Sequence, residues 1–394
     1  MSLQNINLLY FTPCELHEGV GGSARLENMV SIFQQLGVNI QLVSYIPRDE
    51  FRIKYENINR FLNVTKIYVS KLAPKFIKAL AIPLILLFGL KYAKKSDILF
   101  AHAPGIMTGF PAMILAKIFN KPLIVDHMDV NDPDTPEFIF NKVLQNSTVV
   151  FVISHYLEGE VKSKFGKTVI YIPIFIDPEV FQINPLEGKK VREGLGIRDN
   201  DVLIGYAGSF WYVEGVPFLL KACKNLIDKH KNIRLIMIGR MNVGSDNIPM
   251  LLDKLSLREK ANHISHQPRK LIPNYLSACD ILCSPKIDCE INRAANPVKV
   301  IEYLSMGLPV VCSAVGGIIG AVKNGINGLL VKPGNVKDLE EKLEWIILNP
   351  EQAKEMGKNG RKTVIENYSY NAIKNKIKRV IIKIREMKKG NQII

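Results

Sequence analysis

Short apolar runs rich in β-branched residues alternate, along the first half of the chain, with segments whose apolar residues recur at helical spacing. The pattern starts with an apolar run at 6–10, continues through Leu26, Met29 and Phe33 at helical spacing, and reaches a second apolar run at 38–44. That succession is typical of a βαβ unit. Further strands are predicted at 98–102, 123–126, 148–154 and 168–172, with helices at 106–119 and from 155 to 165.

The pattern lapses between residues 173 and 196, where prolines and glycines replace the periodic apolar residues, so this stretch is predicted to connect two domains. A second series follows, with strands predicted at 202–207, 233–239, 281–284 and 309–313 and helices at 217–226, 248–255 and 298–306. Strands that alternate with helices predict an α/β protein with parallel, doubly wound sheets covered on both faces. In such sheets ligands bind at the carboxyl ends of the strands.

Composition narrows the class of protein. The chain has 394 residues, which is long enough for two domains that each bury their own core. Its six cysteines are scattered, which favours a reducing compartment, and neither a CxxC pair nor a histidine cluster predicts a metal site. No export signal is visible, and the most apolar stretch, 79–90, is shorter than the roughly 20 residues that span a bilayer. We therefore expect a cytoplasmic protein without a metal ion.

The charge of the chain points to anionic partners. The formal net charge of +15 lies mostly in the second half, partly in a basic tail that begins at Asn371, and a local basic run spans 48–95. Nucleotide phosphates, acidic lipids and nucleic acid are partners of this kind. Nucleic acid is disfavoured, because few aromatic residues are interleaved with the basic ones and no nucleic-acid-binding motif is present.

The apolar segment from 71 to 95 has lysines at both ends and allows two interpretations. In the first, it lies in the interface of an anionic membrane and brings the protein to a lipid-linked acceptor. In the second, it is a buried helix of the N-terminal sheet whose lysine ends are solvated.

A glycine-rich turn at 19–23 follows the first predicted strand and opens the first predicted helix. Glycines let backbone N–H groups approach an anion at the positive end of a helix, so Gly21 and Gly22 are candidates for binding a phosphate or an acceptor hydroxyl. The turn is not GxGxxG and no acidic residue stands convincingly at the end of the next strand, which disfavours a nicotinamide cofactor. The alternative is a tight strand-to-helix turn without a ligand.

The segment 296–309 contains both the start and the stop signals of a helix. Asn296 is a favourable N-cap, Pro297 occupies the first helical position, and a glycine followed by a proline ends the element. Successive residues are rotated by about 100°, which places Lys299 and Glu302 on the face opposite the apolar residues. A lysine in the first turn opposes the helix dipole unless an anion binds there, so a diphosphate would explain Lys299, and Glu302 would suit ribose hydroxyls. The alternative is a surface Lys–Glu pair.

With its order of asparagine, proline, lysine, glutamate, tyrosine, glycine and proline, the segment 296–309 resembles the C-terminal signature of the family 4 retaining glycosyltransferases, or glycosyltransferase group 1. The similarity continues along almost the whole chain, at Gly21-Gly22, 152–154, Ile172-Pro173 with Asp177, Gly208-Ser209-Phe210 with Gly215-Val216, 278–281 and 327–331. Each motif alone is weak, and together they are specific.

The resemblance implies the GT-B fold, an α/β architecture in which two Rossmann-like, doubly wound domains face a central cleft. It implies an acceptor-side domain at 1–178, a donor domain for the nucleotide sugar at 179–368, and a C-terminal helix at 369–394 that packs back on the first domain. A nucleoside-diphosphate sugar is then the co-substrate, and neither a metal nor another cofactor is expected.

The resemblance also implies roles for individual residues. Glu302 binds the donor ribose, the loop that ends at Lys299 faces the diphosphate, and the first glycine turn closes over the phosphates or the acceptor. The residues expected to bind the donor are Gly21, Gly22, Gly208, Ser209, Arg293, Asn296, Pro297, Val298, Lys299 and Glu302, and those expected to be catalytic are His127, Asp129 and Lys299. His127 and Asp129 match the acceptor-side position of the family, and the alternative for His127 is a capping histidine in a loop.

Three positions depart from the family pattern. Ala294 stands where the family has the first of two glutamates, and Ser209 and Glu214 stand where it has an arginine and a lysine that neutralise the leaving diphosphate. Because stabilising the leaving group is the main electrostatic task of this chemistry, another cation has to take over. The candidates for that cation are Arg293, Lys299 and Lys286.

The resemblance predicts a retaining glycosyltransferase that moves a sugar to a glycan or lipid-linked acceptor in cell-envelope or polysaccharide biosynthesis, in part at the inner face of the cell membrane. Retention through an oxocarbenium-like transition state needs no protein nucleophile, which agrees with the lack of an obvious carboxylate pair of the kind that hydrolases use. Two alternatives are an epimerase that isomerises the nucleotide sugar without an acceptor and, because of the three departures, a non-catalytic partner subunit that binds the nucleotide sugar.

Overall fold

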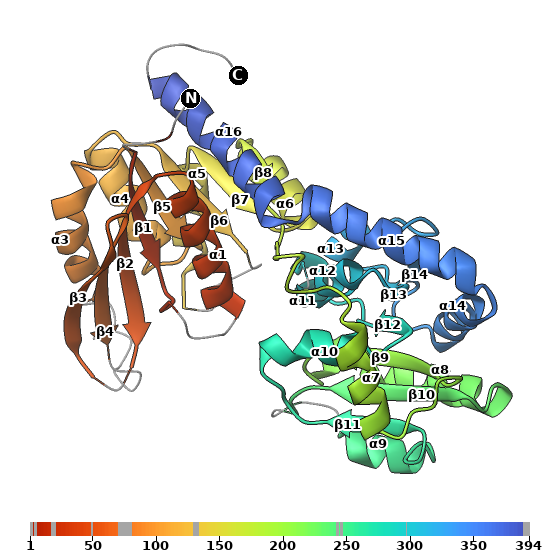
Figure 1. Cartoon of the computed structure of the whole chain (residues 1–394). Helices are drawn as coiled ribbons and strands as arrows, with labels where there is room; N and C mark the ends of the chain where they lie inside the picture. Colours follow the sequence, from red (N-terminus) through yellow and green to blue (C-terminus); the bar gives the residue numbers. More distant parts are fainter. Residues whose placement is uncertain are drawn as a thin grey trace. The chain divides into compact units, whose positions relative to one another are not determined.

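The computed structural model describes residues 3, 6–16, 21–48, 50–69, 81–128, 134–241, 244, 247–296 and 298–388. The chain divides into two compact units, one made of Met1–Pro173 with Ile373–Ile394 and the other of Ile174–Ala372 (Figure 1). We call them the first and the second unit. Two predicted site residues, Asp129 and Pro297, lie outside the described residues, as do residues 70–80 of the basic apolar segment.

The first unit is built on one sheet. Its elements are β1 (Asn7–Thr12), α1 (Gly21–Gln35), β2 (Asn39–Pro47), β3 (Arg52–Asn59), β4 (Leu62–Val69), α3 (Ala81–Ala93), β5 (Ile98–His102), α4 (Gly109–Ile118), β6 (Leu123–His127), α5 (Glu137–Gln145), β7 (Val149–Val152), α6 (His155–Phe165), β8 (Val169–Tyr171) and most of α16 (Tyr370–Lys388). Within the described ranges the strand order is β3-β4-β2-β1-β5-β6-β7-β8, and neighbouring strands are parallel except β3 and β4. Strands β5 and β6 are buried at every position, as expected of a parallel sheet covered on both faces.

The antiparallel hairpin β3–β4 was not predicted from the sequence. Strand β3 forms the edge of the sheet, and most of its residues are exposed. An edge strand in water carries no strict alternation of apolar and polar residues, so the pattern that identifies a half-buried strand is absent here. The basic run that begins at residue 48 therefore includes a pair of strands.

Residues 81–93 of the basic apolar segment form helix α3, which contacts β1, β2, β4 and α4. Its buried side consists of Ala81, Ile85, Gly89 and Ala93. This part of the segment thus belongs to the fold, in line with the second interpretation of its sequence, while the opposite side of the helix is exposed. No helix in the described parts of the chain is both long and apolar enough to cross a membrane.

The second unit contains a second parallel sheet. Its elements are α7 (Pro185–Gly194), β9 (Val202–Ala207), η1 (Tyr212–Glu214), α8 (Val216–Lys229), β10 (Ile233–Ile238), α9 (Ile248–Lys254), β11 (Ala261–Ile264), η2 (Arg269–Leu271), α10 (Ile272–Leu276), β12 (Ile281–Ser284), α11 (Glu290–Ala294), α12 (Val298–Met306), β13 (Val310–Ser313), α13 (Gly317–Ala321), β14 (Leu329–Val331), α14 (Val336–Leu348) and α15 (Pro350–Asn367). In the part of the chain that is described, the strand order is β11-β10-β9-β12-β13-β14, with all neighbours parallel.

Both faces of this second sheet are covered. Alternate residues of a strand point to opposite faces, and in β9 Ile204 belongs to a core cluster with helices α8 and α14, whereas Leu203 belongs to a cluster with α12. Two parallel sheets, each with buried strands and crossing helices, confirm the predicted α/β class with two Rossmann-like units.

Two elements differ from what the sequence pattern indicated. The stretch 173–196 was predicted to connect two domains and was assigned no helix, but it contains helix α7, whose N-cap Asn184 accepts a hydrogen bond from the Glu187 amide. The apolar periodicity is missing because the buried residue of this helix is Gly188, which lies so close to the backbone of Ser277 that a Cβ atom would collide with it. The helix predicted from residue 106 begins at Gly109.

Candidate functional site

Helix α12 confirms the predicted helix 298–306 and carries two of the charged site candidates. Its buried residues include Val300, Ile301 and Leu304, which pack into the core of the second unit. Lys299 and Glu302 lie on the other side, each with 13% of its side chain exposed. Their surroundings therefore decide what these two charges do.

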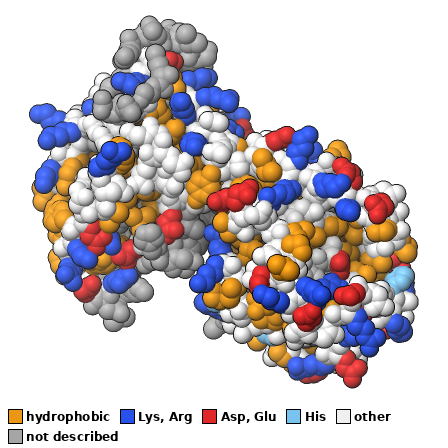
Figure 2. All heavy atoms as spheres, in the orientation of Figure 1, with side chains coloured by type: hydrophobic (Ala, Val, Ile, Leu, Met, Phe, Trp, Pro, Cys, Tyr) orange, Lys and Arg blue, Asp and Glu red, His pale blue; other side chains and the backbone are white. Residues whose placement is uncertain are grey.

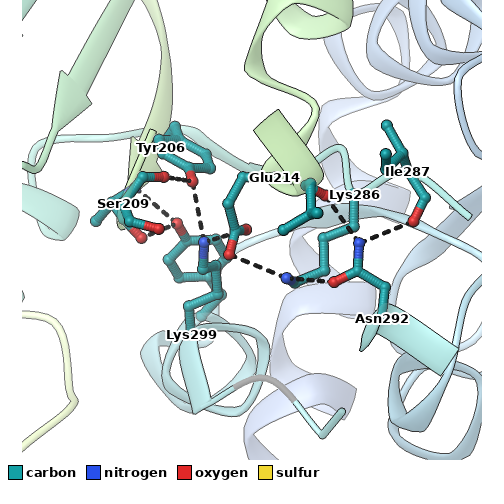
Figure 3. A network of polar contacts seen from close by, with 10 residues as sticks. Tyr206, Ser209, Glu214, Lys286, Ile287, Asn292 and Lys299 are labelled. Atoms are coloured by element: carbon teal, nitrogen blue, oxygen red, sulfur yellow. Dashed lines mark hydrogen bonds and ion pairs between the residues drawn. The ribbon is translucent and has the colours of Figure 1, made fainter. Parts of the chain in front are cut away.

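The ammonium group of Lys299 is held at a turn that follows β9. Its Nζ donates to Glu214 Oε2 at 2.6 Å and to Tyr206 Oη at 3.0 Å, and it lies 4.7 Å from the centre of the Tyr206 ring (Figure 3). The Tyr206 hydroxyl in turn donates to the backbone oxygen of Ser209 at 2.5 Å. The structure thus brings Lys299 and the turn at Gly208 and Ser209 together, as the sequence-based site required.

Gly208 makes this close approach feasible. A Cβ atom at Gly208 would collide with Lys299 Nζ and would come within 3.1 Å of the Tyr206 hydroxyl. Only glycine leaves room for the ammonium group against the backbone of the turn. The same turn is fixed from α12 a second time, because the Tyr303 hydroxyl donates to the Ala207 oxygen at 3.0 Å and accepts from its amide at 2.7 Å.

Glu214 is the centre of a buried charge cluster. Its second oxygen, Oε1, accepts from Lys286 Nζ at 3.0 Å, and Lys286 also donates to Asn292 Oδ1 at 2.8 Å (Figure 3). Asn292 then donates to the backbone oxygens of Val213 and Ile287, each at 2.8 Å. The side chains of Glu214 and Lys286 are only 11% and 7% exposed. We call Tyr206, Glu214, Lys286, Asn292 and Lys299 the lysine cluster.

The pKa values in the lysine cluster follow from burial and from these contacts. Burial alone would raise the pKa of Glu214, but the two ammonium groups and their hydrogen bonds outweigh it and place this pKa below its ordinary range. Burial lowers the pKa of Lys286, and Lys299 adds to this effect, while Glu214 opposes it. The charged forms of Glu214 and Lys286 therefore stabilise each other.

Glu302 has a different partner. Its Oε1 accepts from Arg269 Nη2 at 2.8 Å and from Arg269 Nε at 3.1 Å, and the guanidinium lies 5.4 Å from the centre of the Phe181 ring. Burial raises the pKa of Glu302, and the charges of Arg269 and Lys299 partly offset this rise. Because 57% of the Arg269 side chain is exposed, this partner can move away without breaking a packed core.

The other predicted donor residues near α12 do not share the described hydrogen bonds of the lysine cluster. Arg293 forms an ion pair with Asp288 at 2.7 Å, and both side chains are half exposed, so the structure does not place Arg293 in the cluster. Asn296 is buried, and Val298 packs against the core. Ala294, the position that departs from the family glutamate, is buried as well.

In the first unit, the predicted residues lie near a buried ion pair. Gly21 and Gly22 are the first residues of α1, and one turn later Arg25 forms a two-pronged contact with Asp126 of β6, at 2.7 and 2.8 Å. Arg25 also donates to the backbone oxygens of residues 172 and 173, and the two charged side chains are 2% and 0% exposed. This pair ties the first helix to the middle of the sheet.

His127 is the last residue of β6 and is buried rather than part of a loop. Burial lowers its pKa to about 4, so the ring is neutral at pH 7. The Phe140 ring contacts it edge-on, with centroids 5.3 Å apart, and its Nδ1 has no hydrogen-bond partner among the described residues. A neutral histidine of this kind can donate or accept one further hydrogen bond.

Sequence reasoning missed several residues of these arrangements. They are Tyr206, Asn292, Arg269, Arg25 and Asp126. Only Asp126 carried a signal, because an ionisable residue inside an otherwise apolar strand requires a buried partner. The described residues contain no group of three or more histidine, cysteine, aspartate or glutamate side chains that could hold a metal ion.

Comparison with known proteins finds similarity to glycosyltransferases. A family model described as glycosyl transferases group 1 matches residues 188–363. The D-inositol 3-phosphate glycosyltransferase of Kribbella flavida is 24% identical over 255 residues, which cover 62% of this chain and 58% of that protein. The putative teichuronic acid biosynthesis glycosyltransferase TuaC of Bacillus subtilis is 27% identical over 203 residues, which cover 51% and 47% of the two proteins. The chain spans about half the length of the curated relatives that it matches.

Solved structures resemble the chain over nearly its full length. Anabaena HepE in complex with UDP matches it with a TM-score of 0.76 at 15% identity, over 96% of this chain and 100% of that one. At this level of identity the likeness shows the fold alone, and that fold is GT-B.

Proposed function

Because residues 188–363 match the family model of the glycosyl transferases group 1, we propose that the chain moves a sugar from a nucleoside-diphosphate sugar to a glycan or lipid-linked acceptor in cell-envelope or polysaccharide biosynthesis. Two relatives support the class of donor and pathway. HepE has been solved with UDP and with UDP-glucose, and TuaC is named for teichuronic acid biosynthesis. A uridine diphosphate sugar is therefore the first donor to test.

The observation that carries the proposal is the position of Lys299. It stands in the first turn of α12, where the helix dipole disfavours a cation, and its Nζ lies against the backbone of Gly208 at the carboxyl end of β9. Within the described residues Nζ has two acceptors, so one of its three N–H bonds is left for another. A donor diphosphate would accept that bond and offset the opposing dipole.

We propose that Glu302, one turn further along α12, binds the donor ribose. A carboxylate can accept both hydroxyls of a ribose, and burial strengthens such hydrogen bonds. In the structure Arg269 occupies this carboxylate, so the guanidinium moves aside when the ribose arrives. We assign Gly208, Ser209, Asn296, Pro297 and Val298 to the donor site as well.

The reaction that we propose proceeds with retention. The bond between the anomeric carbon and the leaving phosphate oxygen breaks through an oxocarbenium-like transition state, the acceptor oxygen bonds to the anomeric carbon on the same face, and the acceptor hydroxyl passes its proton to the leaving phosphate. Lys299 stabilises the negative charge that develops on the leaving diphosphate. We assign His127 and Asp129, with the glycines at 21 and 22, to the acceptor side, where the neutral His127 ring would hydrogen-bond a sugar hydroxyl.

Calorimetry with UDP, GDP, ADP and dTDP tests the donor site. We expect one diphosphate to bind, and Glu302→Ala to weaken that binding at least about tenfold, since hydrogen bonds to charged groups contribute about 1.5–3 kcal/mol. The matched control is Glu341→Ala, because Glu341 is an exposed glutamate on α14 of the same unit. Failure of all four diphosphates to bind, or equal binding by Glu302→Ala, would contradict the proposal. Isomerised sugar nucleotide in an acceptor-free reaction would instead identify an epimerase.

We further propose that the first unit contacts an anionic membrane through the outer side of α3. Leu87 and Leu90 on this side are 61% and 40% exposed, and the Phe88 ring contacts the exposed Tyr55 of β3. Exposed basic residues follow on the same helix end, at Lys91 and beyond, and Figure 2 shows hydrophobic and basic side chains next to one another on this edge. Apolar side chains flanked by lysines suit the interface of a bilayer with acidic lipids.

Sedimentation with phospholipid vesicles tests this contact. We expect binding to vesicles that contain phosphatidylglycerol, weak binding to pure phosphatidylcholine, and several-fold weaker binding after Leu87→Asn combined with Leu90→Asn, because each buried leucine contributes about 1.5–3 kcal/mol. Leu348→Asn is the control, since Leu348 is a comparably exposed leucine at the end of α14 in the second unit. Equal binding by all three chains would argue against this surface.

A further inference from the structure

The lysine cluster contains one carboxylate between two ammonium groups. Glu214 contacts Lys299 through Oε2 at 2.6 Å and Lys286 through Oε1 at 3.0 Å, and all three side chains are at most 13% exposed. The sum of the three charges is one positive charge. A buried cluster that existed only to hold the fold would be expected to balance its charges, because an unpaired buried charge is costly.

The two lysines have different surroundings. Lys286 lies between Glu214 and Asn292, and Asn292 in turn fixes the backbone at residues 213 and 287, so Lys286 belongs to a network that joins two loops. Lys299 stands in the first turn of α12 and has one N–H bond left among the described residues. The excess positive charge is thus presented at Lys299, next to Gly208.

Glu214 is itself held rigidly. It ends the short helix η1, and the next residue, Gly215, has a φ of +70°. A Cβ atom at Gly215 would collide with the backbone oxygen of Pro285, so the chain at Glu214 is fixed against the segment that carries Lys286. The carboxylate therefore has little freedom to follow the lysines if they move.

We propose that Glu214 is a positioning residue of the donor site: by bridging Lys286 and Lys299, it offsets the repulsion between the two ammonium groups and holds the Lys299 ammonium against Gly208, where it meets the diphosphate of a nucleoside-diphosphate sugar. This inference rests on the proposed function. It gives a role to the position where the sequence departs from the family lysine, since the cation is supplied from α12 and the carboxylate from η1.

The groups around the two lysines define how pH acts. Lys299 faces Glu214 of η1, Lys286 of the loop after β12, Tyr206 of β9 and Cys312 of β13, and on α12 it acts on Glu302, which Arg269 also contacts. Lys286 additionally faces Cys289. In Glu214→Gln the two ammonium groups repel each other without a carboxylate between them. The pKa of a buried lysine then falls, and its positive charge is lost as pH rises through that lower pKa.

Calorimetric titration with UDP between pH 6.5 and pH 8.5 tests the inference. We expect the unmodified chain to bind UDP with little change over this range, and Glu214→Gln to lose about tenfold in affinity between the two pH values, because the uncharged lysine that accumulates as pH rises no longer binds the diphosphate. The double variant Glu214→Gln with Lys286→Met removes the repulsion, so its binding at pH 8.5 should recover and its pH profile should become flat again.

The control is Asp253→Asn, because Asp253 is an acidic residue of the same unit whose ion pair with Arg258 is exposed. Circular dichroism of every variant at both pH values separates loss of binding from loss of folding. An unchanged pH profile in Glu214→Gln, or no recovery in the double variant, would overturn the role of Glu214 while the donor site stands. If the unmodified chain does not bind UDP, GDP, ADP or dTDP, the proposed function fails, and the inference fails with it.

Discussion

The two units bury charge in opposite ways. In the first unit, Arg25 and Asp126 form a single pair at 2.7 Å, and Arg25 also donates to two backbone oxygens. In the second unit, Glu214 is shared by Lys286 and Lys299, and the cluster keeps one excess positive charge. A balanced pair serves the fold, whereas the excess charge of the unbalanced cluster next to a glycine turn is the feature from which we propose anion binding.

The largest effect that this comparison predicts is on stability, at the balanced pair. Asp126→Asn leaves the Arg25 guanidinium buried without a counter-charge, which should lower the free energy of unfolding by about 3–5 kcal/mol. Chemical denaturation, followed by far-ultraviolet circular dichroism, measures the change in the free energy of unfolding. The double variant Arg25→Met with Asp126→Leu removes both charges and should recover most of the loss. A loss below about 1 kcal/mol in Asp126→Asn would show that water or a local shift satisfies Arg25.

At the unbalanced cluster we expect the reverse, a large effect on binding with a small effect on stability. Lys299→Met removes the cation that we assign to the diphosphate, so the affinity for UDP should fall about 10- to 100-fold, as for the loss of a charge-assisted hydrogen bond. Glu214 keeps Lys286 as its partner, so the midpoint of thermal unfolding should change little. Lys337→Met provides the control, because Lys337 is 85% exposed on α14. Unaltered UDP affinity in Lys299→Met would remove the contrast between the two units.

The same contrast explains what the sequence could predict. Helix α12 and the placement of Lys299 and Glu302 on one side of it were predictable, because caps, proline, glycine and helical periodicity are all local signals within the segment 296–309. The partners Tyr206 and Asn292 were not, since they are brought to Lys299 and Lys286 by the fold and carry no local pattern of their own.

Fold elements follow the same division. Buried strands such as β5 and β6 were predictable because each is a short run of mainly apolar residues, and the structure buries every position of both. The edge strand β3 and helix α7 were missed, because neither buries a periodic apolar face that the sequence could reveal. A periodic pattern of apolar residues indicates that one face of an element is buried against a core. An element that packs through a glycine, or that lies at the edge of a sheet, shows little of this pattern.

A smaller, pH-dependent effect is expected at Glu302, which shares features of both regions. The pair is balanced in charge like that of the first unit, and its carboxylate lies on α12 beside Lys299 of the cluster, but its partner Arg269 is exposed. Burial already raises the pKa of Glu302, and Arg269 opposes this rise, so Arg269→Leu should raise the pKa further. The carboxylate is lost as pH falls through that pKa. UDP binding by Arg269→Leu should therefore weaken a few-fold more than that of the unmodified chain between pH 7.5 and pH 5.5.

Calorimetry at these two pH values measures the effect, and Arg258→Leu, an exposed arginine that contacts Asp253, is the matched control. Parallel pH profiles for Arg269→Leu and the unmodified chain would mean that Glu302 keeps its charge without Arg269, or that UDP does not depend on that charge.

The smallest effect on UDP affinity is expected from substituting Arg293. This substitution tests whether a charge next to the lysine cluster in sequence also takes part in donor binding. Arg293 was a sequence-based candidate for the cation at the diphosphate, but its guanidinium pairs with Asp288 at 2.7 Å on a half-exposed surface. Exposed pairs of this kind contribute about 0–1 kcal/mol, so Arg293→Ala should change UDP affinity less than about threefold and stability by a similarly small amount. If calorimetry shows instead a loss as large as that of Lys299→Met, then donor binding draws Arg293 away from Asp288, and the excess positive charge of the second unit is shared by two cations rather than presented by Lys299 alone.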